Sequence, residues 1–224
     1  MINCIDTIPL FSTLTSEQRS LIFKLITHRS YRSGERIYSP GDKDASIYII
    51  SRGKVRIYRL SENGKEQLIR LLVPGDVTGE LALFKEGTYE AYADCLEDTK
   101  ICMIHHDDFN EVLASYPAIS IKMLAVLANR LSASEQQSTW LSTETVKERL
   151  IHYLVQSAIL DYKGNLVVHL NIAKKDLASY LGTTPETLSR QWTILEDEGI
   201  IVQKSKKMIL LKGVEFEDKR CEVC

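Results

Sequence analysis

The segment 176–196, DLASYLGTTPETLSRQWTILE, constrains the fold of this chain more than any other. Apolar residues recur at helical spacing on both sides of a Gly182-Thr183 break, namely Leu177, Leu181, Leu188, Trp192 and Leu195. This pattern predicts two short packed helices joined by a tight turn, a helix-turn-helix. Thr184 is placed to cap the second helix, and Pro185 suits its first position because proline has no N–H to leave unpaired there.

The second of these helices carries a polar face. Glu186, Ser189 and Arg190 are spaced so that they project from the same side of the helix. Arg can donate two hydrogen bonds to guanine, Glu can accept one from cytosine, and Ser can do either. The alternative interpretation is a plain ion pair between Glu186 and Arg190 on a solvated helix. The residue types favour a helix that reads base edges in a major groove of DNA.

A hairpin with a basic turn follows. Gly199 ends the helix, and two apolar runs, 200–203 and 208–211, flank the lysine-rich turn 204–207. A two-stranded wing with a basic tip is suited to contact phosphates. The predicted DNA interface comprises Thr184, Glu186, Thr187, Ser189, Arg190, Lys174, Lys175, Lys204, Lys206 and Lys207.

Composition limits the remaining possibilities. The chain has 224 residues, enough for one large domain or two small ones, and its net charge is only -2. Affinity for DNA must therefore come from local basic patches and fall steeply with salt. No run approaches the roughly 20 apolar residues of a membrane span, and the first residues lack the pattern of a signal peptide. The sequence predicts a cytoplasmic protein without a membrane partner.

The first half of the chain reads as β-structure. Short runs rich in Ile, Val and Tyr predict strands at 47–50, 55–58, 67–72 and 100–104, and glycines punctuate them. Asn63-Gly64 is the strongest hairpin signal. Many short strands at this spacing are typical of an antiparallel barrel or roll. We expect a helix over 16–27 before the roll, and a β-roll sensor domain over residues 1–116.

A long helix is predicted over 117–141. Its apolar seam, which begins at Ile121, favours a dimerisation helix with Leu124, Leu127, Ala128 and Leu131 at the interface. The alternative is an amphipathic helix packed on its own roll. A break at 141–143, with Thr143 as the candidate cap of a helix over 144–159, begins the C-terminal domain, 142–224. The predicted fold class is α+β: an antiparallel β-roll, a dimerisation helix and a winged helix-turn-helix.

The order of these parts resembles the CRP/FNR family of bacterial transcription regulators over nearly the whole length. The residues that carry the resemblance are Pro74-Gly75-Asp76, the GELALF run at 79–84, and ETLSR at 186–190. The resemblance implies a homodimer on a two-fold symmetric operator, with recognition helices in successive major grooves about 34 Å apart. It also implies contact with RNA polymerase, to which no residue is assigned.

The recognition helix is similar to the FNR class within that family. CRP-like members carry Arg immediately before the Glu, whereas this chain has Pro185, which can donate nothing to a base. The resemblance implies a TTGA-type half-site, with Arg190 on guanine and Glu186 on the cytosine of the opposite strand. One departure is Ala173, where a capping Ser or Thr is usual before the first helix; Asn171 is the candidate substitute.

The sensory pocket departs from the family pattern. A cyclic-nucleotide binder of this family is expected to present an Arg-Ser or Arg-Thr pair to the cyclic phosphate, and here Glu90 and Ala91 fill those positions. A carboxylate repels a phosphate, so binding of cAMP is not expected and the effector is unknown. The candidate effector pocket comprises Gly79, Glu80, Leu81, Glu90, Ala91, Arg130 and Ser134.

The cysteine and histidine residues leave open other signals to which the protein could respond. Cys221 and Cys224 form the one close pair, a candidate redox or iron-sulfur site, although a closed metal site needs about four ligands. Cys4 stands alone near the start, and no disulfide framework is expected. Cys95 and Cys102 are expected to be buried packing residues. His105-His106 is a candidate haem ligand pair. A thiol switch, an organic effector near Arg130, Ser134 and Glu135, and activity without ligand also remain open.

Two other function classes were weighed against a DNA-binding regulator. A cyclic-nucleotide-binding module of a channel or kinase needs neither a helix-turn-helix nor a wing. A jelly-roll oxygenase needs clustered His and carboxylate ligands, whereas the five histidines here fall in different predicted elements. The sequence also lacks a paired nucleophile and base and a phosphate-cradling glycine loop. We therefore expect no enzymatic activity.

Overall fold

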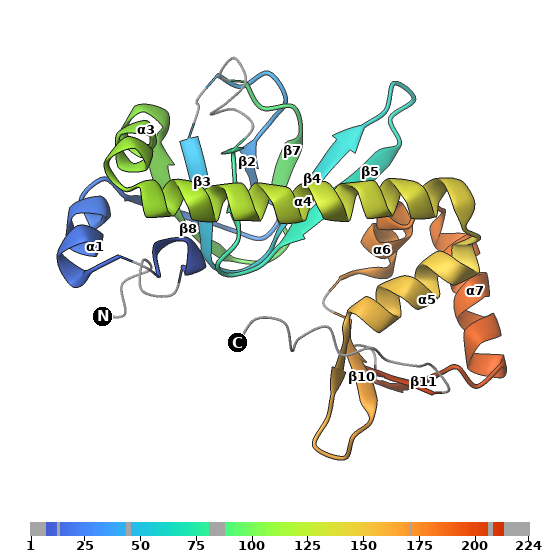
Figure 1. The fold of residues 1–224 in the computed structure, drawn as a ribbon. Coiled ribbons are helices and arrows are strands. Elements are labelled where there is room, and N and C mark those ends of the chain that lie inside the picture. Colours follow the sequence, from blue (N-terminus) through green and yellow to red (C-terminus); the bar gives the residue numbers. More distant parts are fainter. Residues whose placement is uncertain are drawn as a thin grey trace. The chain divides into compact units, whose positions relative to one another are not determined.

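The chain divides into two compact units, residues 1–133 and 134–224 (Figure 1). The division falls inside the long helix, eight residues before the boundary expected at 142. The computed structural model describes residues 8–12, 14–43, 46–80, 88–170, 172–205 and 208–212.

The N-terminal unit is built around two antiparallel sheets, with strand orders β1-β8-β3-β6 and β2-β7-β4-β5. The strands are β1 (Thr27–Tyr31), β2 (Arg36–Tyr38), β3 (Ser46–Arg52), β4 (Val55–Leu60), β5 (Glu66–Leu72), β6 (Val77–Thr78), β7 (Tyr92–Cys95) and β8 (Thr99–His105). All four runs predicted as strands are confirmed. The Asn63-Gly64 turn joins β4 to β5 as predicted, and Gly64 has a positive φ of 77°.

Helices accompany the roll at its start and end. A short 3-10 helix (Pro9–Phe11) precedes α1 (Ser16–Phe23), which Thr15 and Gln18 cap reciprocally. This helix is shorter than predicted: it ends at Phe23 with Lys24 as its C-cap, and Thr27 belongs to β1. After β8 come α3 (His106–Ser115) and α4 (Pro117–Thr143), and Ile119 of α4 is buried in one of the two cores of the roll.

Helix α4 is apolar on two faces. One face packs on the roll, where Met123 is buried and Leu127 lies partly buried against the same core. The other face exposes Ile121, Leu124 and Leu131, whose side chains are 68%, 65% and 61% accessible. The assignment of Leu127 to the dimer seam stays a prediction, because its side chain is partly buried against the roll and partly accessible. One face of α4 thus packs on the roll, and the dimer interface on the other face stays a prediction.

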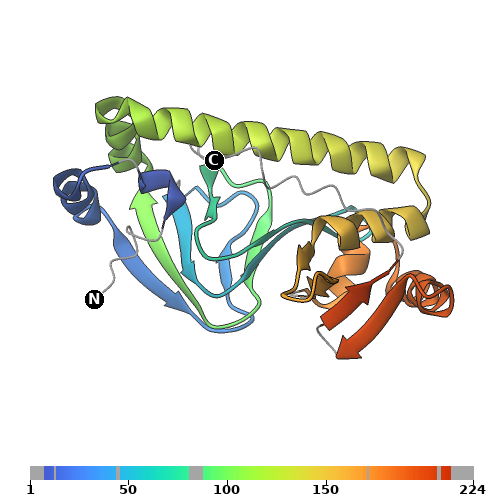
Figure 2. The ribbon, with the colours of Figure 1, turned by 60° about the horizontal axis from the view of Figure 1, so that its bottom comes forward.

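In the described residues, the C-terminal unit combines the last turns of α4 and three further helices with a sheet of order β11-β12-β10-β9. Its elements are α5 (Val146–Gln156), β9 (Ala158–Leu160), β10 (Leu166–His169), α6 (Lys174–Tyr180), α7 (Pro185–Asp197), β11 (Ile201–Ser205) and β12 (Met208–Leu211). The predicted wing is present as β11 and β12, next to the end of α7 (Figure 2). It is one half of a four-stranded sheet, since β12 also pairs with β10.

The start of α5 differs from the prediction. Helix α4 continues through Thr143, and Thr145 caps α5 in a reciprocal pair with Glu148. The helix ends at Gln156 and not at Ile159, which is an exposed residue of β9. The predicted cap, Thr143, is therefore wrong: it is the last residue of α4, and Thr145 caps α5 instead.

No single helix in the described parts of the chain is long and apolar enough to cross a membrane. The bent pair formed by α3 and α4 meets the length and composition test only when the two are taken together.

Candidate nucleic-acid interface

Helices α6 and α7 meet in a tight turn, as the sequence predicted. The N–H groups of Gly182 and Thr183 donate to the carbonyls of Ser179 and Ala178, at 3.1 and 2.9 Å. Gly182 has a φ of 65°, in the left-handed region that favours glycine. The backbone therefore reverses within two residues, which is what places α7 across α6.

The N-terminus of α7 is capped as predicted. Thr184 accepts a hydrogen bond from the backbone N–H of Thr187 at 3.3 Å, and Pro185 occupies the first helical turn. By contrast, Ala173 precedes α6 without any side-chain cap. Asn171, the proposed substitute, lies outside the described residues.

One side of α7 is anchored in the core of the C-terminal unit. Leu188 and Leu195 are fully buried, and Trp192 is 2% exposed. They pack with Leu177 and Ala178 of α6 in one apolar cluster. Because this side is buried, the rotation of α7 about its axis is determined, and with it the side chains that face outward.

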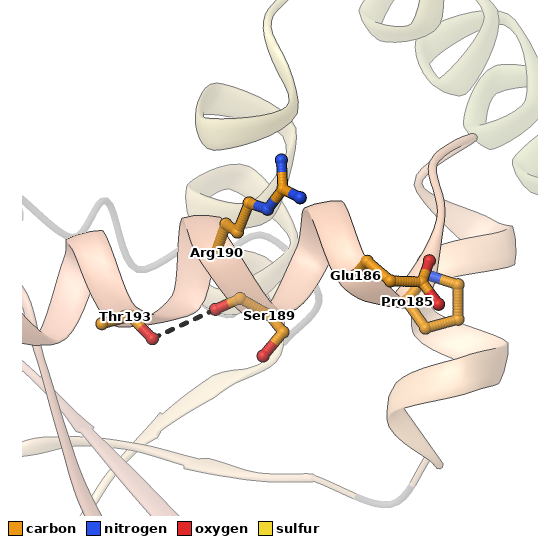
Figure 3. Close-up of a pocket in the computed structure, with 5 residues that line it drawn as sticks. All are labelled: Pro185, Glu186, Ser189, Arg190 and Thr193. Atoms are coloured by element: carbon orange, nitrogen blue, oxygen red, sulfur yellow. Dashed lines mark hydrogen bonds between the residues drawn. The ribbon is translucent and has the colours of Figure 1, made fainter.

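The outward side carries Glu186, Ser189 and Arg190, all of them exposed. With Pro185 and Thr193 they line a shallow open hollow along α7 (Figure 3). Within the described part of the chain, no ion pair joins Glu186 to Arg190, so the alternative of a simple surface pair is not what this structure contains.

Glu186 is held in its charged form. Its own backbone N–H and the hydroxyl of Thr184 are the main groups that lower the pKa of its carboxyl, and the charge of Arg190 contributes further. The carboxylate is therefore an acceptor at neutral pH. An ionised acceptor and a guanidinium with several donors then lie one helical turn apart on an exposed surface.

The predicted lysines have different surroundings. The Lys174 ammonium lies 4.3 Å from the centroid of the Trp192 ring, a cation–π contact that no local pattern of the sequence indicated. Lys175 and Lys204 are exposed on α6 and β11. Lys206 and Lys207, at the predicted tip of the wing, lie outside the described residues.

Three of the candidate effector residues come together inside the N-terminal unit. Glu80 is 3% exposed and forms ion pairs with Arg70, at 2.9 Å, and with Arg130 of α4. Arg130 also donates to the carbonyl of Val77. A Cβ on Gly79 would lie 2.2 Å from a backbone oxygen, so glycine is needed beside Glu80. Arg70 belongs to this cluster and was missed, because it lies ten residues before Glu80, on strand β5.

The other candidate effector residues do not join this cluster. Glu90 is exposed and pairs with Arg59 at 2.5 Å, and Ala91 packs against the second core of the roll. Ser134 is exposed on α4 and belongs to the C-terminal unit. Leu81 lies outside the described residues. The effector pocket predicted from the sequence is therefore assembled only in part.

The described cysteine and histidine side chains form no cluster that could hold a metal ion. Cys95 is a buried free thiol, and Cys102 is buried and disulfide-bonded, which the sequence analysis did not anticipate. His106 contacts Asp107 at 2.9 Å at the start of α3. Among the described residues, no group of three His, Cys, Asp or Glu side chains could hold a metal ion. Cys4, Cys221 and Cys224 lie outside them.

Comparisons with known proteins agree with this architecture. Residues 28–116 match the cyclic nucleotide-binding domain, and residues 148–215 match the Crp-like helix-turn-helix domain. The probable transcriptional regulator flp of Lacticaseibacillus casei is 34% identical over 216 residues, which cover 96% of this chain and 97% of that protein. The chain belongs to the CRP/FNR family of transcription regulators. It is thus a DNA-binding regulator and not an enzyme.

Further CRP/FNR relatives extend the comparison. The cyclic AMP receptor protein of Thermus thermophilus is 31% identical over 193 residues, 86% of this chain and 88% of that protein. A CooA mutant from Carboxydothermus hydrogenoformans superimposes with a TM-score of 0.80 at 25% identity over 91% of each chain. FixK2 from Bradyrhizobium japonicum gives 0.72 at 26% identity, over 84% of this chain and 92% of its own. The predicted α+β fold class is confirmed.

Proposed function

We propose that this CRP/FNR regulator binds a palindromic TTGA-type operator as a homodimer and responds to a signal other than cAMP. The observation that supports operator binding is the exposed row of Glu186, Ser189 and Arg190, none of which is paired with another of the three in the described structure. Arg190 donates to O6 and N7 of guanine, and Glu186 accepts from the cytosine of the opposite strand.

The remaining interface residues would contact phosphates. Thr184 and Thr187 stand at the N-terminus of α7, where backbone N–H groups and the helix dipole favour an anion. Lys174, Lys175 and Lys204 are exposed and add positive charge. Such contacts position a protein on DNA without reading its sequence. Lys206 and Lys207 complete this proposed set.

The dimer is inferred from the outer face of α4. Ile121, Leu124, Ala128 and Leu131 follow one another at spacings of three, four and three residues, the repeat of a coiled-coil seam, and all four are exposed. Three large apolar side chains in water along one stripe favour a partner helix. A second copy of α4 fits this seam, since the family typically forms dimers.

The proposal of a signal other than cAMP rests on charge. Glu90 stands where the family resemblance calls for an arginine, and its ion pair with Arg59 holds a carboxylate at that position. Arg130 is already engaged by Glu80. Because one relative is named a cyclic AMP receptor protein, titration calorimetry with cAMP is a direct test. We expect no binding, and saturable binding at micromolar cAMP would contradict this part of the proposal.

The experiment for the whole function is a binding assay on synthetic duplexes. The protein should prefer a palindromic TTGA duplex over a scrambled duplex at equal salt. Insertion of five base pairs between the half-sites places them on opposite faces of the helix and should abolish the preference. Light scattering should give the mass of two chains. Equal affinity for palindrome and scrambled duplex would contradict the proposal.

The same proposal includes two further points: the protein acts in the cytoplasm, and it contacts RNA polymerase.

A further inference from the structure

The residues that line the hollow on α7 form two rows. Pro185, Ser189 and Thr193 follow one another at intervals of four, and so make one row along the helix. Glu186 and Arg190 make the second row beside it. The second row accounts for the hydrogen bonds to a G·C pair in the proposed function, whereas the first row has no assigned role beyond the hydroxyl of Ser189.

The residues at the two ends of the first row, Pro185 and Thr193, present apolar groups. The side chain of Pro185 consists of carbon alone, and its nitrogen carries no hydrogen. The hydroxyl of Thr193 donates its proton to the backbone carbonyl of Ser189 at 3.2 Å, so Thr193 retains its methyl and the acceptor lone pairs of its oxygen for a ligand (Figure 3). All three residues are exposed. The row therefore offers carbon, hydroxyl and carbon in sequence.

Only one base offers a matching apolar group in the major groove, and that group is the C5-methyl of thymine. We propose that Pro185 and Thr193 are specificity residues that select A·T pairs by contact with thymine methyl groups. This inference rests on the proposed operator binding through α7. It assigns the thymines of the half-site to the apolar row and leaves the guanine to Arg190.

The length of the row supports contacts with two separate base pairs. Eight residues of helix rise about 12 Å, and successive base pairs are about 3.4 Å apart. Pro185 and Thr193 are thus too far apart to share one methyl group. The G·C pair faces the middle of the row. Pro185 contacts a base pair on one side of it and Thr193 contacts a base pair on the other side, so the A·T contacts flank the G·C contact.

The test replaces thymine by deoxyuridine, which removes the methyl group and changes no hydrogen bond. Duplexes carry this replacement at one thymine of one half-site at a time, and fluorescence anisotropy measures Kd for each. Burial of a methyl-sized group is worth about 0.8 kcal/mol, which is roughly a fourfold change in Kd. We expect such a loss at two positions of the half-site and no loss at the others.

Matched variants assign each methyl contact to a residue. Thr193→Ser removes the methyl and keeps the hydroxyl that bonds to Ser189, so one of the two sensitive positions should become insensitive. Thr193→Val keeps the methyl and loses the hydroxyl, and should retain the sensitivity. Pro185→Ala should abolish the effect at the other position. These residues are exposed, and circular dichroism with thermal unfolding checks that each variant is folded.

The outcomes separate this inference from the function on which it rests. If the palindrome is preferred but deoxyuridine has no effect at any position, the methyl contacts are overturned and operator binding stands. If the sensitivity survives unchanged in both Thr193→Ser and Pro185→Ala, other residues read the methyl groups and the inference is equally overturned. If the palindrome is not preferred over a scrambled duplex, both fall together.

Discussion

Gly182, in the turn of the helix-turn-helix, lies against Leu141 near the end of α4. A Cβ on Gly182 would come within 2.6 Å of the Leu141 Cδ2 atom. One hydrogen bond joins α4 to the last residue of α6: Gln137 donates to the carbonyl of Tyr180 at 3.0 Å. A second holds Leu141 itself, since Arg149 of α5 donates to its carbonyl at 3.1 Å. The last turns of α4 are therefore attached to the turn that orients α7.

Replacement of Gly182 by Ala tests this attachment. Gly199 is a matched control, since it also has a positive φ of 72° but a Cβ there would meet no atom within 4 Å. Gly199→Ala should cost about 1–2 kcal/mol from the left-handed backbone alone. Gly182→Ala should cost more in urea unfolding, and Leu141→Ala in the same chain should remove the excess. Equal losses of unfolding free energy in the two glycine variants would mean that the Leu141 side chain moves aside without cost.

Arg190→Ala tests the reading of guanine. We expect a loss of about 1–3 kcal/mol on the operator and relaxed choice at that base pair, because two donors to guanine disappear. The control Lys204→Ala should weaken operator and random duplexes alike and reduce the salt dependence. Competition binding at several salt concentrations measures both. Equal losses on specific and random DNA for Arg190→Ala would refute its assigned role.

The two faces of α4 should respond differently to substitution. Leu124→Glu places a charge in the exposed seam and should shift the protein from dimer to monomer while the roll remains folded. Met123→Ala opens a cavity in the roll core and should cost about 2–5 kcal/mol, without a comparable shift in mass. Analytical ultracentrifugation measures the change in mass, and urea unfolding measures the change in the free energy of unfolding. A Leu124→Glu protein that stays dimeric would show that the seam lies elsewhere.

Glu80 and Glu90 should differ in their effect on stability. Glu80→Gln leaves Arg70 and Arg130 without their shared carboxylate in a buried cluster, and should cost roughly 3 kcal/mol. Glu90→Gln breaks an exposed pair with Arg59, which is worth about 1 kcal/mol at most. Denaturant unfolding of both variants provides the comparison. Similar small losses would mean that water screens Glu80 more than its burial implies.

Stability should fall at alkaline pH because of Tyr38. Burial raises the pKa of its hydroxyl to about 12, and that hydroxyl lies 2.6 Å from the Thr78 hydroxyl. The unfolded value is about 10, so this contribution to stability is fully present below pH 10 and is lost, to the extent of roughly 3 kcal/mol, as pH rises to 12. Unfolding free energies of the wild type and Tyr38→Phe across this range should converge as pH rises. If the unfolding free energies of the two proteins instead run parallel with pH, the assignment of this pH dependence to Tyr38 is contradicted.

Much of the geometry of α7 was predictable because its determinants are local. Thr184 and Pro185 define the start of α7, and the spacing of Leu188, Trp192 and Leu195 defines its buried side. Once that side is known, the exposed position of Arg190 follows from 3.6 residues per turn. The long runs β3, β4, β5 and β8 were predictable for the same reason, since their apolar residues are contiguous.

Elements with weak local signals were not predicted. Strand β1, Thr27–Tyr31, is mostly exposed and polar, so nothing in its pattern separates it from the preceding helix. It is a strand because it pairs with β8, with Thr27 opposite Met103. In the same way β10 forms between β9 and β12, and its pairing with β12 joins segments about forty residues apart.

The sequence by itself determined helix α7, its cap and its outward residues, because hydrogen bonds and side-chain spacing within one helix depend on residues a few positions apart. Only the tertiary structure decided which face of α4 Leu127 occupies, that Lys174 covers Trp192, and that Arg70 and Arg130 share Glu80. Helix α4 is apolar on two sides, and the charged partners lie ten and fifty residues apart. Such choices depend on which surfaces meet when helices and strands pack within each unit, and the local spacing of residues does not determine that.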